Sequence, residues 1–120
     1  MRALIGAPKT WDIFDSAVRT RGDLAGVFEY EEMAEPQNAS AYFYLYRKEA
    51  ETVGSVLGAI HIRSGPWPIT EADIAVQWND NEQRVGLFVF GALVAVFDVA
   101  TGAQYGGQYG KDFHPEIPWS

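Results

Sequence analysis

The groups of this chain that could carry out chemistry include two histidines, five serines and 16 acidic residues. His61 lies in an alternating apolar segment, and His114 precedes Pro115 without an HExxH spacing. The chain has no cysteine, which excludes thiolate metal sites, disulfides and thiol nucleophiles. We therefore predict no metal site. We interpret His61 as a structural or surface residue and His114 as a turn or partner-contact residue.

Motifs for nucleophilic catalysis and phosphate binding are also missing. No serine stands in a GxSxG elbow, and the glycine-rich run 102–107 is followed by neither GK[ST] nor a helical pattern. Turns and bulges explain that run better than a phosphate cradle. The many acids offer carboxylate pairs for acid–base work, but their spacing does not show which of them converge. We predict no catalytic residue and no cofactor, which favours a protein that is not an enzyme.

Asp98 is the chemically unusual acid, because it follows the hydrophobic run from Leu93 to Phe97. A carboxylate in such a place must lie at a sheet rim, pair with a base or accept backbone N–H bonds. We favour a cap on the turn at residues 100–102, a role that aspartate often takes. The alternative is an acid with a perturbed pKa in a pocket.

A two-residue loop at Gly91-Ala92 fits a type II′ hairpin, which needs positive φ at its first central residue. The register of that hairpin sets Asp98 opposite Val85. Arg84 is then not the expected partner of Asp98.

Acidic residues concentrate in one segment of a chain whose net charge is −7. Glu29, Glu31, Glu32 and Glu35 have no basic residue among them. A solvated strand end and loop is the usual explanation for such a run. The alternative is a surface that docks on a protein partner with a basic surface. The acidic charge disfavours nucleic-acid binding, which needs clustered Lys and Arg.

Aromatic residues also stand on segments expected to be irregular, namely Trp67, Tyr105, Tyr109 and Trp119. Such residues either cover the core or anchor an interface, and the sequence supports both interpretations. The candidate partner-binding residues are Glu29, Glu31, Glu32, Glu35, Tyr105, Tyr109, His114 and Trp119.

The elements that must position these residues are strands. Residues 74–78 alternate between the two faces of a strand, and the stretch from Asp73 to Tyr105 is predicted to be an antiparallel β-meander. Residues 25–30, 41–46 and 56–63 also have strand character. Apolar residues on both faces of the central hairpin indicate either that both faces are covered or that the hairpin lies in the middle of the sheet. The aromatic tail is expected to pack on the sheet.

We predict a single domain over residues 1–120 that is mainly β, with a curved antiparallel meander forming a sandwich-like sheet. At most one short helix is expected, near residues 48–55 or 69–73. Residues 10–20 fit either a helix capped by Thr10 or a strand. The predicted core consists of Val27, Phe28, Phe43, Leu45, Ile60, Ile62, Ile74, Val76, Trp78, Leu87, Val89, Val94, Val96 and Phe97.

The chain has no segment expected to cross a membrane. The longest apolar stretch, Val85 to Phe97, is too short to span a bilayer as a helix. The N-terminal segment has only a short apolar run, so no signal peptide is predicted. These features favour a cytoplasmic protein.

Four segments occur here in a distinctive order: Val27-Phe28-Glu29, Tyr42-Phe43-Tyr44, Ile60-His61-Ile62 and Ala95-Val96-Phe97-Asp98. With these segments the chain resembles an uncharacterised family of small bacterial proteins, the domain of unknown function numbered 2251, over about residues 25–109. The acidic loop is longer here, and the tail does not match.

The resemblance implies a strand rather than a helix over residues 11–18. It also implies a bacterial, cytoplasmic protein and supplies no catalytic residue. Our leading hypothesis is a non-enzymatic binding protein, such as an immunity protein that neutralises a toxin by protein–protein contact. The alternatives are a small-ligand-binding or enzymatic β-domain with a pocket near Asp98, and a structural subunit that forms oligomers such as a homodimer.

Overall fold

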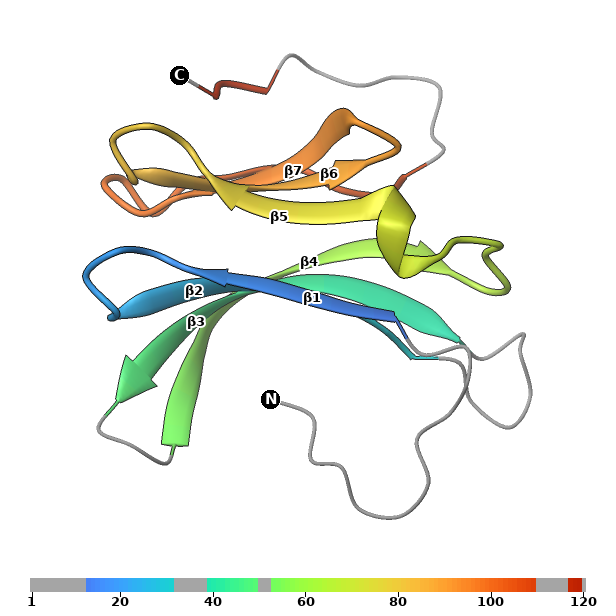
Figure 1. Cartoon of the computed structure of the whole chain (residues 1–120), viewed down its shortest axis with the longest axis horizontal. Coiled ribbons are helices and arrows are strands. Elements are labelled where there is room, and N and C mark those ends of the chain that lie inside the picture. The colour runs from blue at the N-terminus through green and yellow to red at the C-terminus, as the bar shows by residue number, and fades with distance from the viewer. Residues whose placement is uncertain (1–12, 32–38, 50–52, 110–116, 120) are drawn as a thin grey trace.

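The computed structural model describes residues 13–31, 39–49, 53–109 and 117–119, which form two antiparallel sheets of four strands each. Sheet A contains β1 (Ile13–Val18), β2 (Leu24–Glu31), β3 (Ser40–Glu49) and β4 (Val53–Ser64). Sheet B contains β5 (Ile74–Trp78), β6 (Arg84–Val89), β7 (Ala92–Asp98) and β8 (Gln104–Gly106). Figure 1 shows the two sheets stacked as layers, each a meander in chain order. The predicted mainly β, sandwich-like architecture is confirmed.

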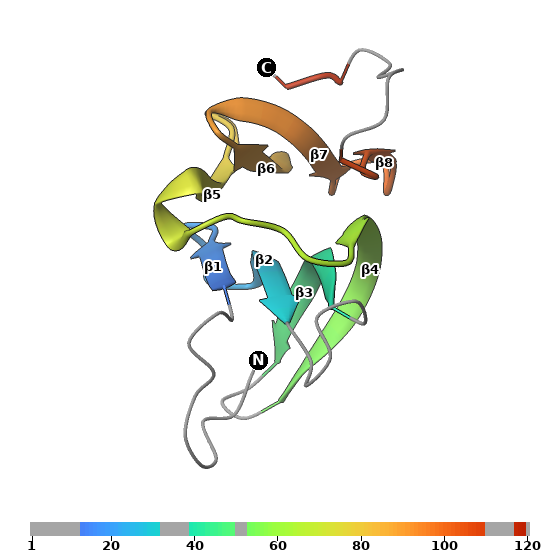
Figure 2. The same cartoon turned by 90° about the vertical axis from the view of Figure 1, so that its right-hand side faces the viewer.

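The core consists of side chains from both sheets. Figure 2 shows the two sheets as separate layers. Side chains alternate along each strand, so every second residue of sheet A faces sheet B. In β2 and β3 the inward residues include Phe28 and Phe43, which are opposite each other and completely buried. From sheet B, Val85, Leu87 and Val89 meet them. Burial of each such side chain contributes about 1.5–3 kcal/mol, which makes this layer the main source of stability.

Hydrogen bonds join the two sheets along both sides. On one side, the Asp15 carboxylate accepts the Val76 N–H at 2.9 Å, and the Trp78 indole donates to the Ala17 carbonyl at 2.9 Å. On the other side, the N–H groups of Gln108 and Tyr109 donate to carbonyls of β4. Hydrogen bonds therefore connect the two sheets at both sides, which makes the sandwich resemble a barrel.

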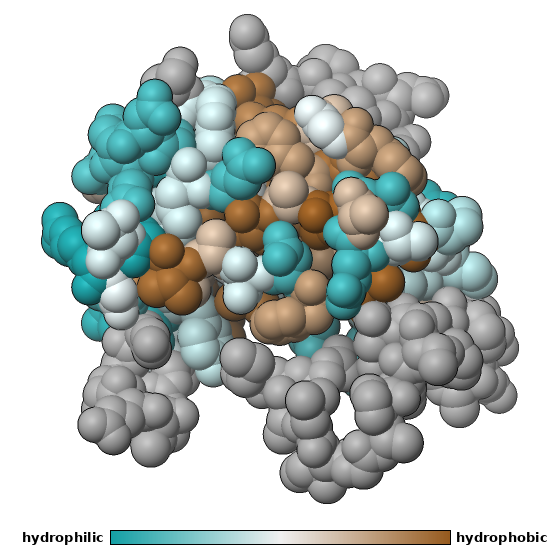
Figure 3. Space-filling model, in the orientation of Figure 1, coloured by the Kyte–Doolittle hydropathy of each residue, from teal (hydrophilic) through white to brown (hydrophobic). Residues whose placement is uncertain are grey.

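Arg19 ties together the turns at one end of the two sheets. Its guanidinium forms a two-pronged pair with Asp23, at 2.8 and 2.9 Å, and donates to the Glu82 carbonyl at 2.9 Å. It also lies 5.6 Å from the centroid of the Trp78 ring. Figure 3 shows hydrophilic residues gathered over this end of the molecule. The sequence does not identify this role of Arg19, because Glu82 of the second turn lies far from Arg19 along the chain.

The hairpin between β6 and β7 differs from the expected one. Phe90 and Gly91 are its two central residues, with φ of 51° and 80°, and Val89 pairs with Ala92. The prediction of a type II′ loop at Gly91-Ala92 is wrong, since two successive positive φ values belong to a type I′ loop. A register shift between Leu87 and Phe88 then moves the remaining pairs one position back toward the expected register, so that Arg84 lies opposite Asp98.

The outer face of sheet B is covered by the end of the chain. The Trp119 and Phe88 rings meet edge to face with centroids 5.3 Å apart, and Asn79 donates to the Trp119 carbonyl at 2.8 Å. A Cβ added to Gly86 would lie 2.7 Å from the Trp119 ring, so the absent side chain lets the ring approach the strand. This contact explains why Val96, on the same face, is completely buried. β6 and β7 are the central strands of sheet B, and residues 117–119 pack on its outer face, so the expectations for the central hairpin and for this part of the tail are confirmed.

Most of the predicted core is buried, with one clear exception. Val27 lies on the outer face of sheet A and is only half-buried, so its assignment to the core is wrong. Leu45, Trp78 and Val94 are half-buried but pack against the core. The core also contains Tyr30, Trp67 and Val85, which were not among its predicted residues. Tyr30 and Trp67 meet edge to face at 6.0 Å.

Short helical structure is confined to one 3-10 turn at Glu71–Asp73 among the described residues. This turn lies in the second of the two regions where a helix was expected. In the first region, residues 48–49 and 53–55 belong to β-strands. Residues 13–18 form β1, in agreement with the strand that the family resemblance implies. No helix in the described part of the chain is long and apolar enough to cross a membrane.

Candidate protein-binding face

The outer face of sheet A carries three cross-strand rows of side chains. Strand alternation and register define them as Val18, Ala25, Tyr46 and Val56; Ser16, Val27, Tyr44 and Ala59; and Phe14, Glu29, Tyr42 and His61. Glu31 and Ser40 continue the face beyond the third row. We call these 14 residues the tyrosine face. It is apolar at the Val18 end and becomes polar and acidic at the Glu31 end.

The aromatic groups of the tyrosine face form a connected cluster. The Tyr42 and Tyr44 rings are stacked, with centroids 5.8 Å apart and planes 16° from parallel. The His61 ring packs edge-on against Tyr42 at 5.2 Å, and its Nε2 lies 2.8 Å from the Ser64 hydroxyl. These contacts hold the rings in place in the free protein, which lowers the entropy that binding must remove.

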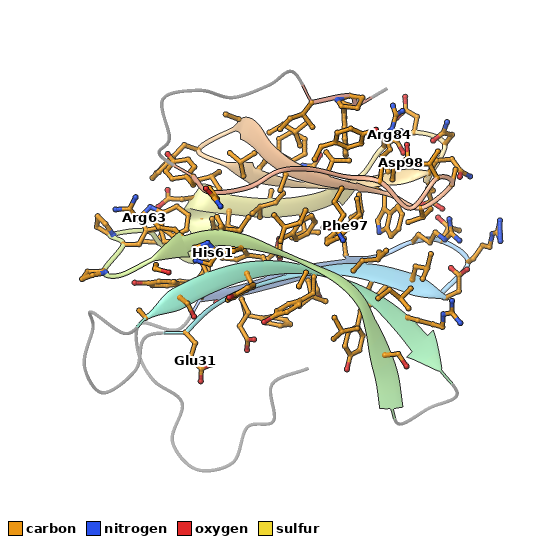
Figure 4. The ribbon with its side chains drawn as sticks, turned by 180° about the vertical axis from the view of Figure 1, so that it is seen from behind. Glu31, His61, Arg63, Arg84, Phe97 and Asp98 are labelled. Carbon is orange, nitrogen blue, oxygen red and sulfur yellow. The ribbon has the colours of Figure 1, made fainter. Side chains whose placement is uncertain are left out.

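Carboxylates adjoin this cluster. Glu29 lies directly opposite Tyr42 on the neighbouring strand, and Glu31 lies opposite Ser40. Burial raises the pKa of Tyr44 above its ordinary value, and Glu29, Tyr42 and Glu31 raise it further. Figure 4 shows Glu31 pointing away from sheet B. No Lys or Arg is present among the residues of this face whose side chains the structure describes.

The predicted partner-binding residues are not gathered in one place. Glu29 and Glu31 share the tyrosine face, whereas Trp119 packs on the opposite side of the molecule, over sheet B. Tyr109 packs against Trp67 with ring centroids 5.1 Å apart. Tyr105 is a half-buried residue of the short edge strand β8. Tyr109 therefore covers the core between the sheets, and Trp119 covers the outer face of sheet B. Glu32, Glu35 and His114 lie outside the described residues.

Asp98 serves as the cap that the sequence favoured. One carboxylate oxygen accepts the N–H groups of Ala100 and Thr101 at 3.0 and 3.1 Å, and the other accepts Arg84 Nε at 2.9 Å. The expectation that Arg84 is not its partner is therefore wrong. The shifted hairpin register places Arg84 opposite Asp98, and Figure 4 shows the two side chains together.

The charge on Asp98 is stabilised in place. Burial raises the pKa of Asp98, but the hydrogen bond from Arg84 and those from the turn N–H groups outweigh it, so the pKa lies below its ordinary value. A carboxylate held this way is a structural anion. It also lines a hollow between the sheets, so the pocket interpretation keeps a structural basis.

The described residues offer little for metal chemistry. They contain no group of three or more His, Asp or Glu side chains that could hold a metal ion. His61 has an aromatic and a hydroxyl neighbour, which suits a positioned surface histidine.

The tyrosine face escaped sequence analysis as a site, although its signal was present. The segment Tyr42-Phe43-Tyr44-Leu45-Tyr46 places a tyrosine at every second position, and strand alternation puts all three on one side. What the sequence could not supply was the register that brings Glu29 beside Tyr42. Comparisons with family models, curated proteins and solved structures find no match for this chain.

Proposed function

We propose that this chain is a non-enzymatic binding protein that contacts a protein partner through the tyrosine face. The observation that carries the proposal is the stacked tyrosine cluster next to Glu29 and Glu31 on an outer sheet face. Tyrosine supplies a large, amphipathic contact area at low entropic cost, and it is enriched where proteins bind each other.

Charge indicates the kind of partner. The whole chain carries a net charge of −7, and the described side chains of the tyrosine face include two carboxylates but no Lys or Arg. If the tyrosine face of a second copy met this one, like charges would oppose each other, which is unfavourable. A partner with Lys and Arg on its surface gains both a faster encounter and specificity. Arginine suits it best, because a guanidinium both stacks on aromatic rings and pairs with carboxylates.

The finer form of the proposal is a bacterial, cytoplasmic immunity protein that neutralises a basic toxin. Support comes from the small size, the acidic charge and the resemblance to an uncharacterised bacterial family. An inhibitor of this kind needs a complementary surface and no chemistry of its own. The toxin would then be stopped by occlusion of its basic surface.

The test is capture of partners on two matched baits. Glu29→Lys/Glu31→Lys reverses the charge of the tyrosine face, and Glu71→Lys/Asp80→Lys makes the same charge change at exposed positions elsewhere. We expect a partner that binds both the natural chain and the Glu71→Lys/Asp80→Lys bait. The same partner should not bind the Glu29→Lys/Glu31→Lys bait. With that partner purified, the affinity measured by calorimetry should fall as salt rises.

Circular dichroism melting checks that both baits fold. If the Lys pair lowers the melting temperature, Glu29→Gln/Glu31→Gln replaces it, with Glu71→Gln/Asp80→Asn as its control. Equal retention of the partner by both baits would rule out the tyrosine face as the docking surface. Co-expression that fails to relieve the toxicity of a captured toxin would rule out the immunity role alone.

A further inference from the structure

A hollow of about 250 Å³ opens between the sheets at the end where the β3–β4 hairpin curves away from sheet B. Figures 1 and 2 both show that hairpin diverging from the other layer. The walls combine apolar side chains from both sheets, chiefly Leu24, Leu45, Leu57 and Phe97. Phe97 points from β7 into the space between the sheets, as Figure 4 shows. The mouths of β-barrels and sandwiches are common places for small ligands.

Two details of β4 shape this hollow. Leu45 pairs with Gly58 and Tyr46 with Val56, so Leu57 is the extra residue of a β-bulge. Bulges redirect side chains, and Leu57 stands at the hollow with 44% of its surface exposed. At Gly58 an added Cβ would lie 2.8 Å from both the Phe97 ring and the Gln104 amide nitrogen. The absence of a side chain at Gly58 therefore leaves room for Phe97 and Gln104, which both line the hollow.

The polar groups around the hollow favour an anion. Arg47 is exposed and has no hydrogen-bond or ion-pair partner within the described part of the chain, and the Gln104 amide offers further N–H donors. Asp98 is the sole carboxylate among the described lining residues. Its charge is already offset by Arg84 at 2.9 Å and by two turn N–H groups. Arg47 is thus the charged group without a partner among the described lining residues.

We propose that this hollow binds a small apolar carboxylate, with its apolar body among the leucines and Phe97 and its carboxylate at Arg47. The volume sets the ligand size. A cavity of about 150 Å³ accommodates benzene, so a hollow of about 250 Å³ suits about ten non-hydrogen atoms. An aryl acetate has this size and charge. The site is separate from the tyrosine face and does not depend on the proposed partner.

The test is a titration of the full chain with phenylacetate, followed by two-dimensional amide NMR. We expect saturable shifts centred on the lining residues, and no such shifts with phenethylamine, which has a similar size but the opposite charge. Arg47→Gln should weaken binding by about tenfold, because it removes a charge-assisted hydrogen bond. Arg21→Gln removes the same charge from an exposed position outside the lining and should leave binding unchanged.

A second pair of variants tests the apolar wall. Leu57→Ala should weaken binding by about threefold to tenfold. Val56→Ala, at the neighbouring exposed position outside the lining, should have no effect. The amide spectra report directly whether each variant is folded. The proposal is overturned if phenylacetate causes no shifts at millimolar concentration, if phenethylamine binds equally well, or if Arg47→Gln binds like the natural chain.

Discussion

Buried polar side chains mark the end of the molecule that carries the β1–β2 and β5–β6 turns. Arg19, Asn79 and Asp98 are each less than a tenth exposed, and each forms hydrogen bonds to a turn. Burial of an unpaired charge is costly, whereas a charge with several partners can hold neighbouring turns in place. Asp98 combines both functions, because it caps its own turn and pairs with Arg84 across the hairpin.

Replacing Asp98 should separate these two contributions. Asp98→Asn keeps an oxygen for the turn N–H groups but loses the ion pair, so we expect a loss of about 1–3 kcal/mol of unfolding free energy near neutral pH. Asp98→Ala also removes the cap and should cost about 1 kcal/mol more. Urea unfolding of both variants provides the measurement. Equal losses would show that the cap adds nothing.

The acid sensitivity of the fold should depend on the same carboxylate. The pKa of Asp98 in the folded chain is lower than in the unfolded chain, so its charged form stabilises the fold above the ordinary aspartate pKa. That stability is lost as the pH falls below about 4 and through the folded pKa. Asp98→Asn should therefore lose less stability over this range than the natural chain. An unchanged acid profile would assign the sensitivity to other groups.

At the scale of the elements, the β6–β7 hairpin contains a residue poorly suited to its conformation. Phe90 has φ of 51° and an exposed ring, at 58% of its surface. Positive φ is unfavourable for a bulky side chain, while Asn tolerates it and Asn-Gly is a preferred type I′ pair. Phe90→Asn should therefore raise the unfolding free energy by about 1 kcal/mol.

The matched control for this gain is Phe90→Ala. Alanine removes the exposed ring but keeps the unfavourable φ, so we expect little change in the denaturant midpoint. A gain as large as that of Phe90→Asn would show that loss of the ring, and not the turn conformation, is responsible. Either substitution leaves the backbone bond from the Phe90 N–H to the Asp73 carbonyl available.

At the scale of the whole molecule, three layers of side chains stabilise the fold: the core between the sheets, the tail over sheet B and the tyrosine face outside sheet A. The tail layer depends on close approach of Trp119 to Gly86. Gly86→Ala should cost about 1–3 kcal/mol, because its Cβ overlaps the Trp119 ring and Leu93. In a Trp119→Ala background the cost should be at least about 0.5 kcal/mol smaller.

A second glycine provides the control for this double-mutant cycle. A Cβ at Gly26 would lie 2.5 Å from a Val85 methyl group inside the core, on the face of β6 opposite to the tail. Gly26→Ala should also destabilise the fold, but its cost should be the same with and without Trp119→Ala. Additive costs at Gly86, measured by denaturant unfolding, would contradict the proposed contact between tail and sheet.

Local patterns in the sequence determined the elements of this protein. Alternation over residues 74–78 and 41–46 identified strands correctly, because side chains of a strand point to opposite faces whatever surrounds them. The aromatic character of the tail likewise predicted that it packs on the sheet. Asp98 was recognised as a turn cap, since its partners lie within three residues along the chain.

Register and the pairing of distant residues were decided only by the tertiary structure. One shift at Leu87/Phe88, together with the loop at Phe90-Gly91, set Arg84 opposite Asp98 against the sequence expectation. The register of β2 and β3 likewise placed Glu29 beside Tyr42, and the bulge in β4 turned Leu57 toward the hollow. The alternating pattern of a strand is the same whichever register it adopts. A slip of one or two residues nevertheless changes every cross-strand neighbour. For this reason the strands could be predicted from the sequence alone, whereas the tyrosine face and the hollow could not.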